Sequence, residues 1–207
     1  MSLQAWTVFA LFWVMFVTTP GPNAVNCISN GMQFGFRRAL WGVLGILTQA
    51  ALFLTLSAFG VTALIAASPQ VYFWMRLVGA AVLVALGVRA LLFAGRPVGV
   101  RVVPARSIYG RALVIATVNA KSVAGYLAAF TQFVQPDVPV WDQMGVIFPT
   151  ALVITAASYC GFTAIGALMG RAALGAVLNV WFRRVMGVAF ILYGVALGLS
   201  GPSLVRG

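Results

Sequence analysis

The sequence lacks histidine and glutamate altogether, and its 207 residues include only two carboxylate side chains, Asp137 and Asp142. Its two cysteines, Cys27 and Cys160, lie alone inside apolar runs. Histidine-based catalysis, hydrolysis by paired carboxylates and metal binding by clustered ligands are therefore almost excluded. We expect a protein that is not an enzyme, with no catalytic residue, no metal and no cofactor.

Charged side chains are also scarce, at 7% of the chain, whereas 62% of the residues are hydrophobic. A soluble domain of this size could not bury so many apolar side chains. Crossing the hydrocarbon core takes roughly 20 apolar residues in a helix, and a lipid-exposed backbone must satisfy its own hydrogen bonds. The sequence predicts an all-α integral membrane protein with six transmembrane helices, at about 5–35, 39–67, 71–94, 108–134, 143–168 and 180–200.

The formal net charge of +11 would favour a nucleic-acid partner in a soluble protein, but here the cations flank apolar segments. Cytoplasmic loops of membrane proteins collect Lys and Arg, so we interpret the cations as topology signals and expect no nucleic acid. With six spans and the N-terminus outside, ten arginines fall on the inner face and only Arg76 and Arg206 on the outer face. Both termini are therefore expected outside. Residues 1–19 carry no positive side chain, so we expect the first segment to be retained and not cleaved as a signal peptide.

Two segments of the sequence resemble each other. Residues 73–81 in the third predicted span match residues 181–189 in the sixth, with Arg76 aligned to Arg184. Two copies of three spans insert in opposite orientations, because three is odd. This is the inverted repeat that many secondary transporters use for alternating access. The predicted organisation is a first three-helix repeat over 1–94, a cytoplasmic linker over 95–107 and a second three-helix repeat over 108–207.

A first polar cluster, Pro20-Gly21-Pro22-Asn23, follows about 15 apolar residues of the first span, or roughly 22 Å of helix. Two prolines remove backbone donors and clash with the preceding turn, so we expect the helix to break here. Asn23 stands where a second half-helix would begin and is expected to cap it. A helix start inside the membrane offers free amides to a substrate carboxylate. The alternative is a proline kink that only bends the span.

A second polar cluster, Asn119-Ala120-Lys121-Ser122, lies about eleven residues into the fourth span and contains the only lysine of the chain. An ammonium at mid-depth costs about 2.5 to 3.5 kcal/mol on insertion scales. Snorkelling towards the inner face is the alternative, but Arg111 is ten residues away, about 15 Å along a helix, which exceeds the reach of lysine. We therefore expect Lys121 to anchor an anionic group or to titrate in coupling, while Asn119 and Ser122 add neutral hydrogen bonds.

Isolated polar residues in the spans are weaker signals. Thr48 and Gln49 in the second span, and Thr155 in the fifth, are included among the candidate residues of a substrate pathway. Such side chains also bond between helices as ordinary packing, and the sequence leaves both roles open.

Four elements of the sequence resemble the LysE/RhtB family of amino-acid exporters. In matching order and spacing over about residues 5–200, they are Pro20-Gly21-Pro22-Asn23, Gly35-Phe36-Arg37-Arg38-Ala39, Asn119-Ala120-Lys121-Ser122 and Gln132-Phe133-Val134. The resemblance implies efflux of amino acids or related small metabolites across the bacterial cytoplasmic membrane, driven by an ion gradient.

Two departures from the family pattern change the expected cargo. The family usually has Asn-Pro-Lys, and Ala120 here replaces the proline, which predicts a softer break in the fourth span. Many relatives carry an acid in the fifth span, at the position that Thr155 occupies here. Without that carboxylate, a neutral or anionic cargo is favoured over a cationic one, and proton coupling loses its obvious carrier.

The sequence thus predicts a secondary active exporter whose two broken spans meet near the membrane midplane, where rocking of one half against the other exposes the site alternately. The substrate-binding residues are expected to be Pro20, Gly21, Pro22, Asn23, Thr48, Gln49, Asn119, Lys121, Ser122 and Thr155. The expected partners are a small molecule carrying a carboxylate, a coupling ion such as H+, and the lipid bilayer, with homo-oligomerisation left open. The alternatives are a non-transporting scaffold or subunit of the same fold, a passive channel, and a membrane-embedded enzyme, for which the chain offers few nucleophiles.

Overall fold

The described part of the chain is built from α-helices and contains no strand. A computed structural model describes residues 2–67, 69–96, 107–135, 137–170, 172–173, 175 and 179–199. Its helices are α1 (Leu3–Thr18), α2 (Pro22–Ala67), α3 (Pro69–Leu92), α4 (Ile108–Thr117), α5 (Ala120–Phe133), α6 (Val140–Met169) and α8 (Val180–Leu199). The prediction of an all-α protein is confirmed for these residues, whereas most of the predicted linker, 97–106, lies outside them.

Two of these helices are long and apolar enough to cross a membrane, at Pro22–Gly60 and Val140–Met169. Shorter apolar helices occupy Leu3–Thr18, Leu77–Leu92 and Ile108–Thr117. α1 and α4 are short because each ends at an interruption of its span. The first span continues beyond the interruption in α2, and the fourth continues in α5.

The two interruptions lie at the positions that the sequence predicts. α1 ends at Thr18 and α2 begins at Pro22, while α4 ends at Thr117 and α5 begins at Ala120. Proline is tolerated as the first residue of a helix because its missing N–H would have no partner inside the helix. The second break has no proline. Here Asn119 caps α5, and its side chain accepts a hydrogen bond from the α5 backbone.

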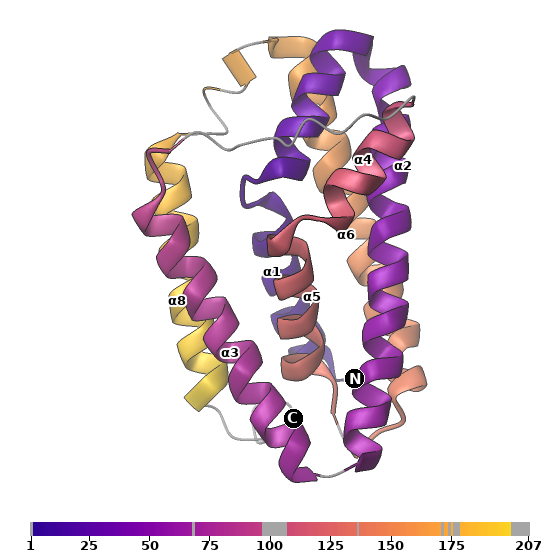
Figure 1. The fold of residues 1–207 in the computed structure, drawn as a ribbon, viewed down its shortest axis with the longest axis vertical. Helices are drawn as coiled ribbons and strands as arrows, with labels where there is room; N and C mark the ends of the chain where they lie inside the picture. The colour runs from indigo at the N-terminus through magenta and orange to yellow at the C-terminus, as the bar shows by residue number, and fades with distance from the viewer. Residues whose placement is uncertain are drawn as a thin grey trace.

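Gly35 joins the first two predicted spans within one continuous helical element. Its φ of 70° and ψ of 167° are not helical, and this region of backbone space is open essentially to glycine alone. The parts of α2 before and after Gly35 run in opposite directions (Figure 1). α1 with the first part of α2 therefore forms the first predicted span, and the second part of α2 forms the second.

The aromatic face of α1 forms the centre of the main hydrophobic core. Phe9, Phe12, Trp13 and Phe16 are buried there against residues of α5 and α6. The Trp13 indole Nε1 donates to the Ala151 carbonyl oxygen at 3.0 Å, so the buried polar tip of the ring is satisfied on α6. This packing holds the end of α1 in place.

α3 and α8 lie side by side as a pair, on the left of Figure 1. A Cβ on Gly87 would lie only 2.6 Å from the Gly187 carbonyl oxygen, and a Cβ on Gly194 only 2.9 Å from that of Ala80. The backbones therefore approach as closely as glycine allows. Arg183 in α8 also donates to the carbonyl oxygens of Phe93 (2.9 Å), Arg96 (2.6 Å) and Ala94 (2.5 Å), just beyond the end of α3. These backbone contacts and hydrogen bonds hold α3 and α8 together.

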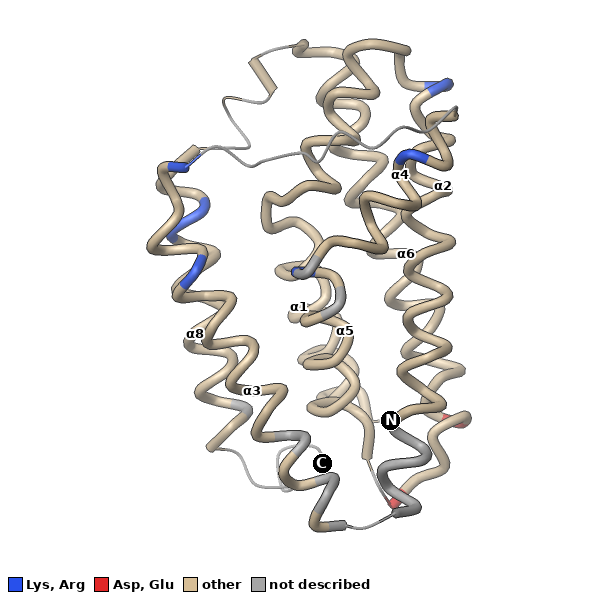
Figure 2. Tube along the Cα trace, in the orientation of Figure 1, with Lys and Arg blue, Asp and Glu red and all other residues tan. Residues whose placement is uncertain are grey.

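Among the side chains that the structure describes, most positive ones lie at one end of the bundle and the negative ones at the other. Figure 2 shows the described Lys and Arg residues near one end, at the bend of α2, the start of α4, the end of α3 and the start of α8, with one exception midway. That exception is in the first turn of α5, where the lysine lies. The acidic residues lie at the other end, where α1 begins and α8 ends.

The close packing of α3 on α8 makes a testable prediction. In Gly87→Ala the new methyl group would meet the Gly187 carbonyl oxygen, so the helices must separate, at a cost of about 1–3 kcal/mol. Gly161→Ala in α6 is the matched control, because nothing lies within 4 Å of its Cβ. Thermal unfolding of the detergent-purified proteins should show a lower midpoint for Gly87→Ala only. Equal midpoints for the two variants would contradict the pairing.

Candidate functional site

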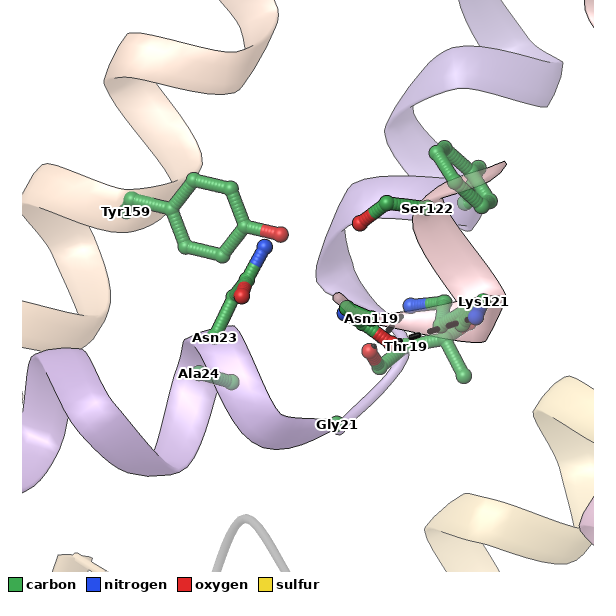
Figure 3. Close-up of a pocket in the computed structure, with 9 residues that line it drawn as sticks. Thr19, Gly21, Asn23, Ala24, Asn119, Lys121, Ser122 and Tyr159 are labelled. Atoms are coloured by element: carbon green, nitrogen blue, oxygen red, sulfur yellow. Dashed lines mark hydrogen bonds between the residues drawn. The ribbon is translucent and has the colours of Figure 1, made fainter. Parts of the chain in front are cut away.

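The two interrupted helices meet at the only lysine of the chain. The Lys121 Nζ donates a hydrogen bond of 2.6 Å to the carbonyl oxygen of Thr19, the residue that caps the C-terminal end of α1 (Figure 3). A Cβ on Gly21 would lie 3.6 Å from Lys121 Cδ, so the side chain crosses directly over the first break. Lys121 therefore links one interruption to the other.

This position explains how the fold tolerates an ammonium among apolar helices. The last carbonyls of a helix have no partner inside the helix and form the negative end of its dipole, which favours a cation. The ring of Phe16 adds a second favourable contact, with its centroid 5.0 Å from Nζ. The ammonium is satisfied locally by α1, and snorkelling to the surface is not needed.

The backbone around Lys121 is held by its neighbour. Asn119 Oδ1 accepts a hydrogen bond of 3.1 Å from the Lys121 amide. Asn119 and Ser122 are both buried. α5 therefore begins with a capped helix start although Ala120 replaces the proline, and the prediction of a softer break than in relatives stays a prediction.

A small pocket lies between the two breaks and α6. Its volume of about 10 Å³ is room for about one water-sized group. Figure 3 shows the side chains of Asn23, Ser122 and Tyr159 directed towards this shared space. Its walls are Phe16, Thr19, Gly21, Asn23, Ala24, Asn119, Lys121, Ser122 and Tyr159.

A much larger cleft of about 950 Å³ adjoins the small pocket. It separates the two breaks from the α3–α8 pair and extends from Lys121 to Arg96, near the arginine-rich end. Arg89 and Arg183 also line it, and among the described residues no carboxylate does. The two cavities share Thr19, Gly21, Asn119 and Lys121. Lys121 thus lies where a wide positive cleft ends in a narrow polar pocket.

The structure brings most of the predicted site residues together. Pro20, Gly21 and Pro22 line the cleft. Asn23 lines the pocket, but its expected role as a helix cap is wrong, because α2 already begins at Pro22 and Asn23 lies inside the first turn. Its side chain faces the Tyr159 hydroxyl, with which it interacts.

Three predicted site residues lie away from both cavities. Thr48 accepts a hydrogen bond of 3.0 Å from the Tyr109 hydroxyl of α4, and Thr155 accepts one of 3.0 Å from Trp13. Gln49 is buried on α2. For Thr48 and Thr155 the observed contacts are the interhelical packing that the sequence left open as the alternative.

Tyr159 is one of four pocket residues that the sequence analysis missed, together with Phe16, Thr19 and Ala24. A single tyrosine within an apolar span is an ordinary packing residue, and the sequence does not tell which face of α6 it occupies. The only indication in the sequence is that the hydroxyl of a buried tyrosine needs a hydrogen-bond partner.

Comparison with known proteins gives a consistent result. The model of the LysE type translocator family matches residues 14–201. An uncharacterized membrane protein of Vibrio cholerae is 30% identical, over 97% of this chain and 99% of the relative. The leucine efflux protein of Salmonella typhimurium is 29% identical over 77% of each chain, and the homoserine/homoserine lactone efflux protein of the same organism is 23% identical over 95% of this chain and 97% of the relative. No solved structure matches the chain.

The course of the cleft predicts that position 121 is reached from one side of the membrane only. Lys121→Cys, in a Cys27→Ser, Cys160→Ser background, should react with a membrane-impermeant maleimide applied to the face that carries the arginines, and not from the opposite face. Ala128→Cys is the control, because Ala128 is fully buried in the core and should stay unlabelled from either face. Labelling of Lys121→Cys from the acidic end would contradict the direction of the cleft.

Proposed function

Because the chain belongs to the family of LysE type translocators, we propose that it is a secondary active exporter that moves amino acids or related small metabolites out of the bacterial cytoplasm. The observation that carries this proposal is the position of Lys121 at the inner end of the cleft, between two interrupted helices. A non-transporting scaffold of the same fold would have no use for a cavity that reaches its only lysine.

The carboxylate of the substrate is the group that Lys121 would bind. The Thr19 carbonyl now accepts the hydrogen bond of the Lys121 ammonium, and a carboxylate is a stronger partner because the bond becomes charge-assisted on both sides. The start of α2 adds free backbone amides at Gly21 and Asn23, although Pro22 itself has no donor. A helix N-terminus favours an anion, so both groups act on the same end of the substrate.

The charges of the cleft favour a neutral or anionic cargo over a cationic one. Arg89 and Arg96 approach the Phe93 ring, at 5.4 Å and 4.5 Å from its centroid, and Arg183 caps α3. Like charges lining one cleft focus its potential and repel a cationic side chain. The leucine and homoserine named for the relatives have uncharged side chains, which agrees with this preference.

The bacterial inner membrane, with several crossings and both termini outside, is the proposed setting. Arginines gather at one end of the bundle, while α1 begins and α8 ends at the other. The end with more positive charge faces the cytoplasm in such membranes. In this orientation the cleft, which extends to Arg96, lies open towards the cytoplasm, as the inward-facing state of an exporter requires.

An inverted repeat is supported by the way in which the helices pair. α3 and α8, the third span of each predicted repeat, run antiparallel and meet at Gly87 with Gly187 and at Ala80 with Gly194. The two similar sequence segments are offset by 108 residues. Applying this offset to Gly87 and Gly187 gives positions within one residue of Gly194 and Ala80, so the two contacts are related by the repeat. α1 contacts α6, and Tyr193 of α8 bonds to α1, while in the fourth span α4 contacts α2 and α5 contacts α3.

The moving body in alternating access is then the α3–α8 pair. It contains one helix from each repeat, and the glycine contacts and the Arg183 hydrogen bonds hold it together. The cleft lies between this pair and the two breaks, while α3 contacts α5, and Tyr193 of α8 bonds to α1, away from the breaks. In this proposal the α3–α8 pair closes over the bound substrate, instead of one half rocking against the other as the sequence analysis expected. An ion gradient, with H+ as a candidate, would drive the cycle.

Removing the ammonium tests this function. Cells that express the protein should release one or a few amino acids during growth on dipeptides, as measured by mass spectrometry of the medium, and Lys121→Met should abolish the release while its abundance in the membrane is unchanged. Arg184→Met is the matched control, because it also removes one cation but does not line the cleft. Equal release by Lys121→Met and the wild type would refute the proposal, and no release by the wild type would favour a scaffold.

The preference for uncharged cargo has its own test. In proteoliposomes, transport of labelled leucine should be inhibited by homoserine at least tenfold more strongly than by lysine, because the cleft repels a second positive charge. The difference should shrink at high ionic strength, where salt screens exposed charges. Inhibition by lysine as strong as that by homoserine would contradict the assignment of charge preference to the arginines.

A further inference from the structure

The small pocket contains a buried hydrogen-bond acceptor that has no donor. Asn23 is 3% exposed, and among the described residues its Oδ1 has no hydrogen-bond partner. Leaving such a group unsatisfied costs stability, and buried polar atoms in proteins almost always have partners. The pocket beside it holds about one water-sized group. The missing partner is therefore a small group that donates hydrogen bonds.

Three polar side chains from three different helices surround this position. Asn23 comes from α2, Ser122 from α5 and Tyr159 from α6, and together they bring the oxygens of three side chains to the pocket wall. Figure 3 shows the Ser122 and Tyr159 oxygens directed towards one another, with the nitrogen of the Asn23 amide beside the Tyr159 hydroxyl. The Tyr159 oxygen interacts with Asn23 and keeps lone-pair capacity, since a phenol oxygen both donates and accepts. The Lys121 ammonium is bonded to the Thr19 carbonyl, and both residues lie where the pocket and the cleft meet. The pocket thus presents neutral oxygens on its far side, and the cation lies at its junction with the cleft.

We propose that this pocket binds the α-ammonium group of the exported amino acid. The inference rests on the proposed function, in which Lys121 and the start of α2 bind the carboxylate. An ammonium has three donors, one for each of the three oxygens. One carbon atom separates the ammonium from the carboxylate in an α-amino acid, and four residues are common to the pocket and the cleft. A substrate with its carboxylate at Lys121 therefore has its ammonium at the mouth of the pocket and its side chain in the cleft.

The consequence is a selectivity for α-amino acids that does not depend on their side chains. An α-hydroxy acid offers one donor in place of three, and a site built to bind a polar group discriminates against an analogue that lacks it. The wide cleft then tolerates different side chains, whereas the pocket requires the amine. Tyr159 and Asn23 are specificity-determining residues in this account, beside the carboxylate anchor Lys121.

The test uses Tyr159→Phe, which keeps the ring and removes only the hydroxyl. Purified protein in proteoliposomes transports labelled L-leucine, and (S)-2-hydroxy-4-methylpentanoate, its α-hydroxy analogue, serves as competitor. In the wild type the half-saturating concentration of leucine should be about tenfold lower than the inhibition constant of the hydroxy acid. In Tyr159→Phe the value for leucine should rise about tenfold, while that for the hydroxy acid changes by less than about twofold, so the discrimination disappears.

Two controls separate this inference from the proposed function. Tyr109→Phe removes a hydroxyl that bonds to Thr48, away from both cavities, and should keep the wild-type discrimination. Lys121→Met should weaken the binding of leucine and of the hydroxy acid to the same extent. Equal weakening of both compounds in Tyr159→Phe, or no change, would overturn the ammonium site and leave the proposed function standing. A wild type that binds neither compound would refute the proposed function and this inference with it.

Discussion

One hydrogen bond joins the two unusual features of this fold, and the rest of the site is arranged around it. The ammonium of the only lysine, Lys121, is held by the Thr19 carbonyl at the end of α1. Such a contact requires a helix that ends inside the bundle, because an uninterrupted helix uses its carbonyls internally. The cost of a charge at mid-depth, about 2.5 to 3.5 kcal/mol on insertion scales, is offset without a carboxylate. The breaks and the lysine therefore depend on each other.

The same constraint supports the proposal that the site binds and releases an anion. A lysine paired with a buried carboxylate would be neutralised permanently, whereas a carbonyl satisfies the ammonium and leaves its charge uncompensated. A substrate carboxylate can then replace a neutral acceptor. The positive cleft, from Arg96 to Lys121, draws an anionic group towards that charge. The α3–α8 pair forms the opposite wall of the cleft.

The sequence predicts those parts of the fold that depend on the backbone chemistry of single residues. Pro20 and Pro22 forbid a continuous helix, so the first break follows from them. The second break follows from Asn119 beside an isolated lysine, and it persists without proline because the asparagine cap alone is enough to begin α5. The apolar runs likewise predict helices, because a backbone in lipid must satisfy its own hydrogen bonds and a helix does so within one segment.

Other parts could not be predicted, because they depend on which faces of the helices meet. The partner of Lys121 is a backbone carbonyl, which has no signature in the sequence. Tyr159 and Thr155 lie one turn apart on α6, yet only Tyr159 reaches the pocket, while Thr155 contacts Trp13. Polar side chains between helices serve packing and binding alike, so Thr48 and Gln49 could not be assigned from residue type. The continuity of α2 through Gly35 also depends on a local backbone conformation.

The presence of a single lysine allows the central claim to be measured directly. Protein labelled with ¹⁵N only at lysine Nζ should give one side-chain resonance, that of Lys121. If its ammonium exchanges the Thr19 carbonyl for a substrate carboxylate, saturating amounts of a transported amino acid should shift this resonance, and an amine of the same side chain without the carboxylate should not. A resonance that stays unchanged in the presence of a saturating, transported amino acid would contradict the account.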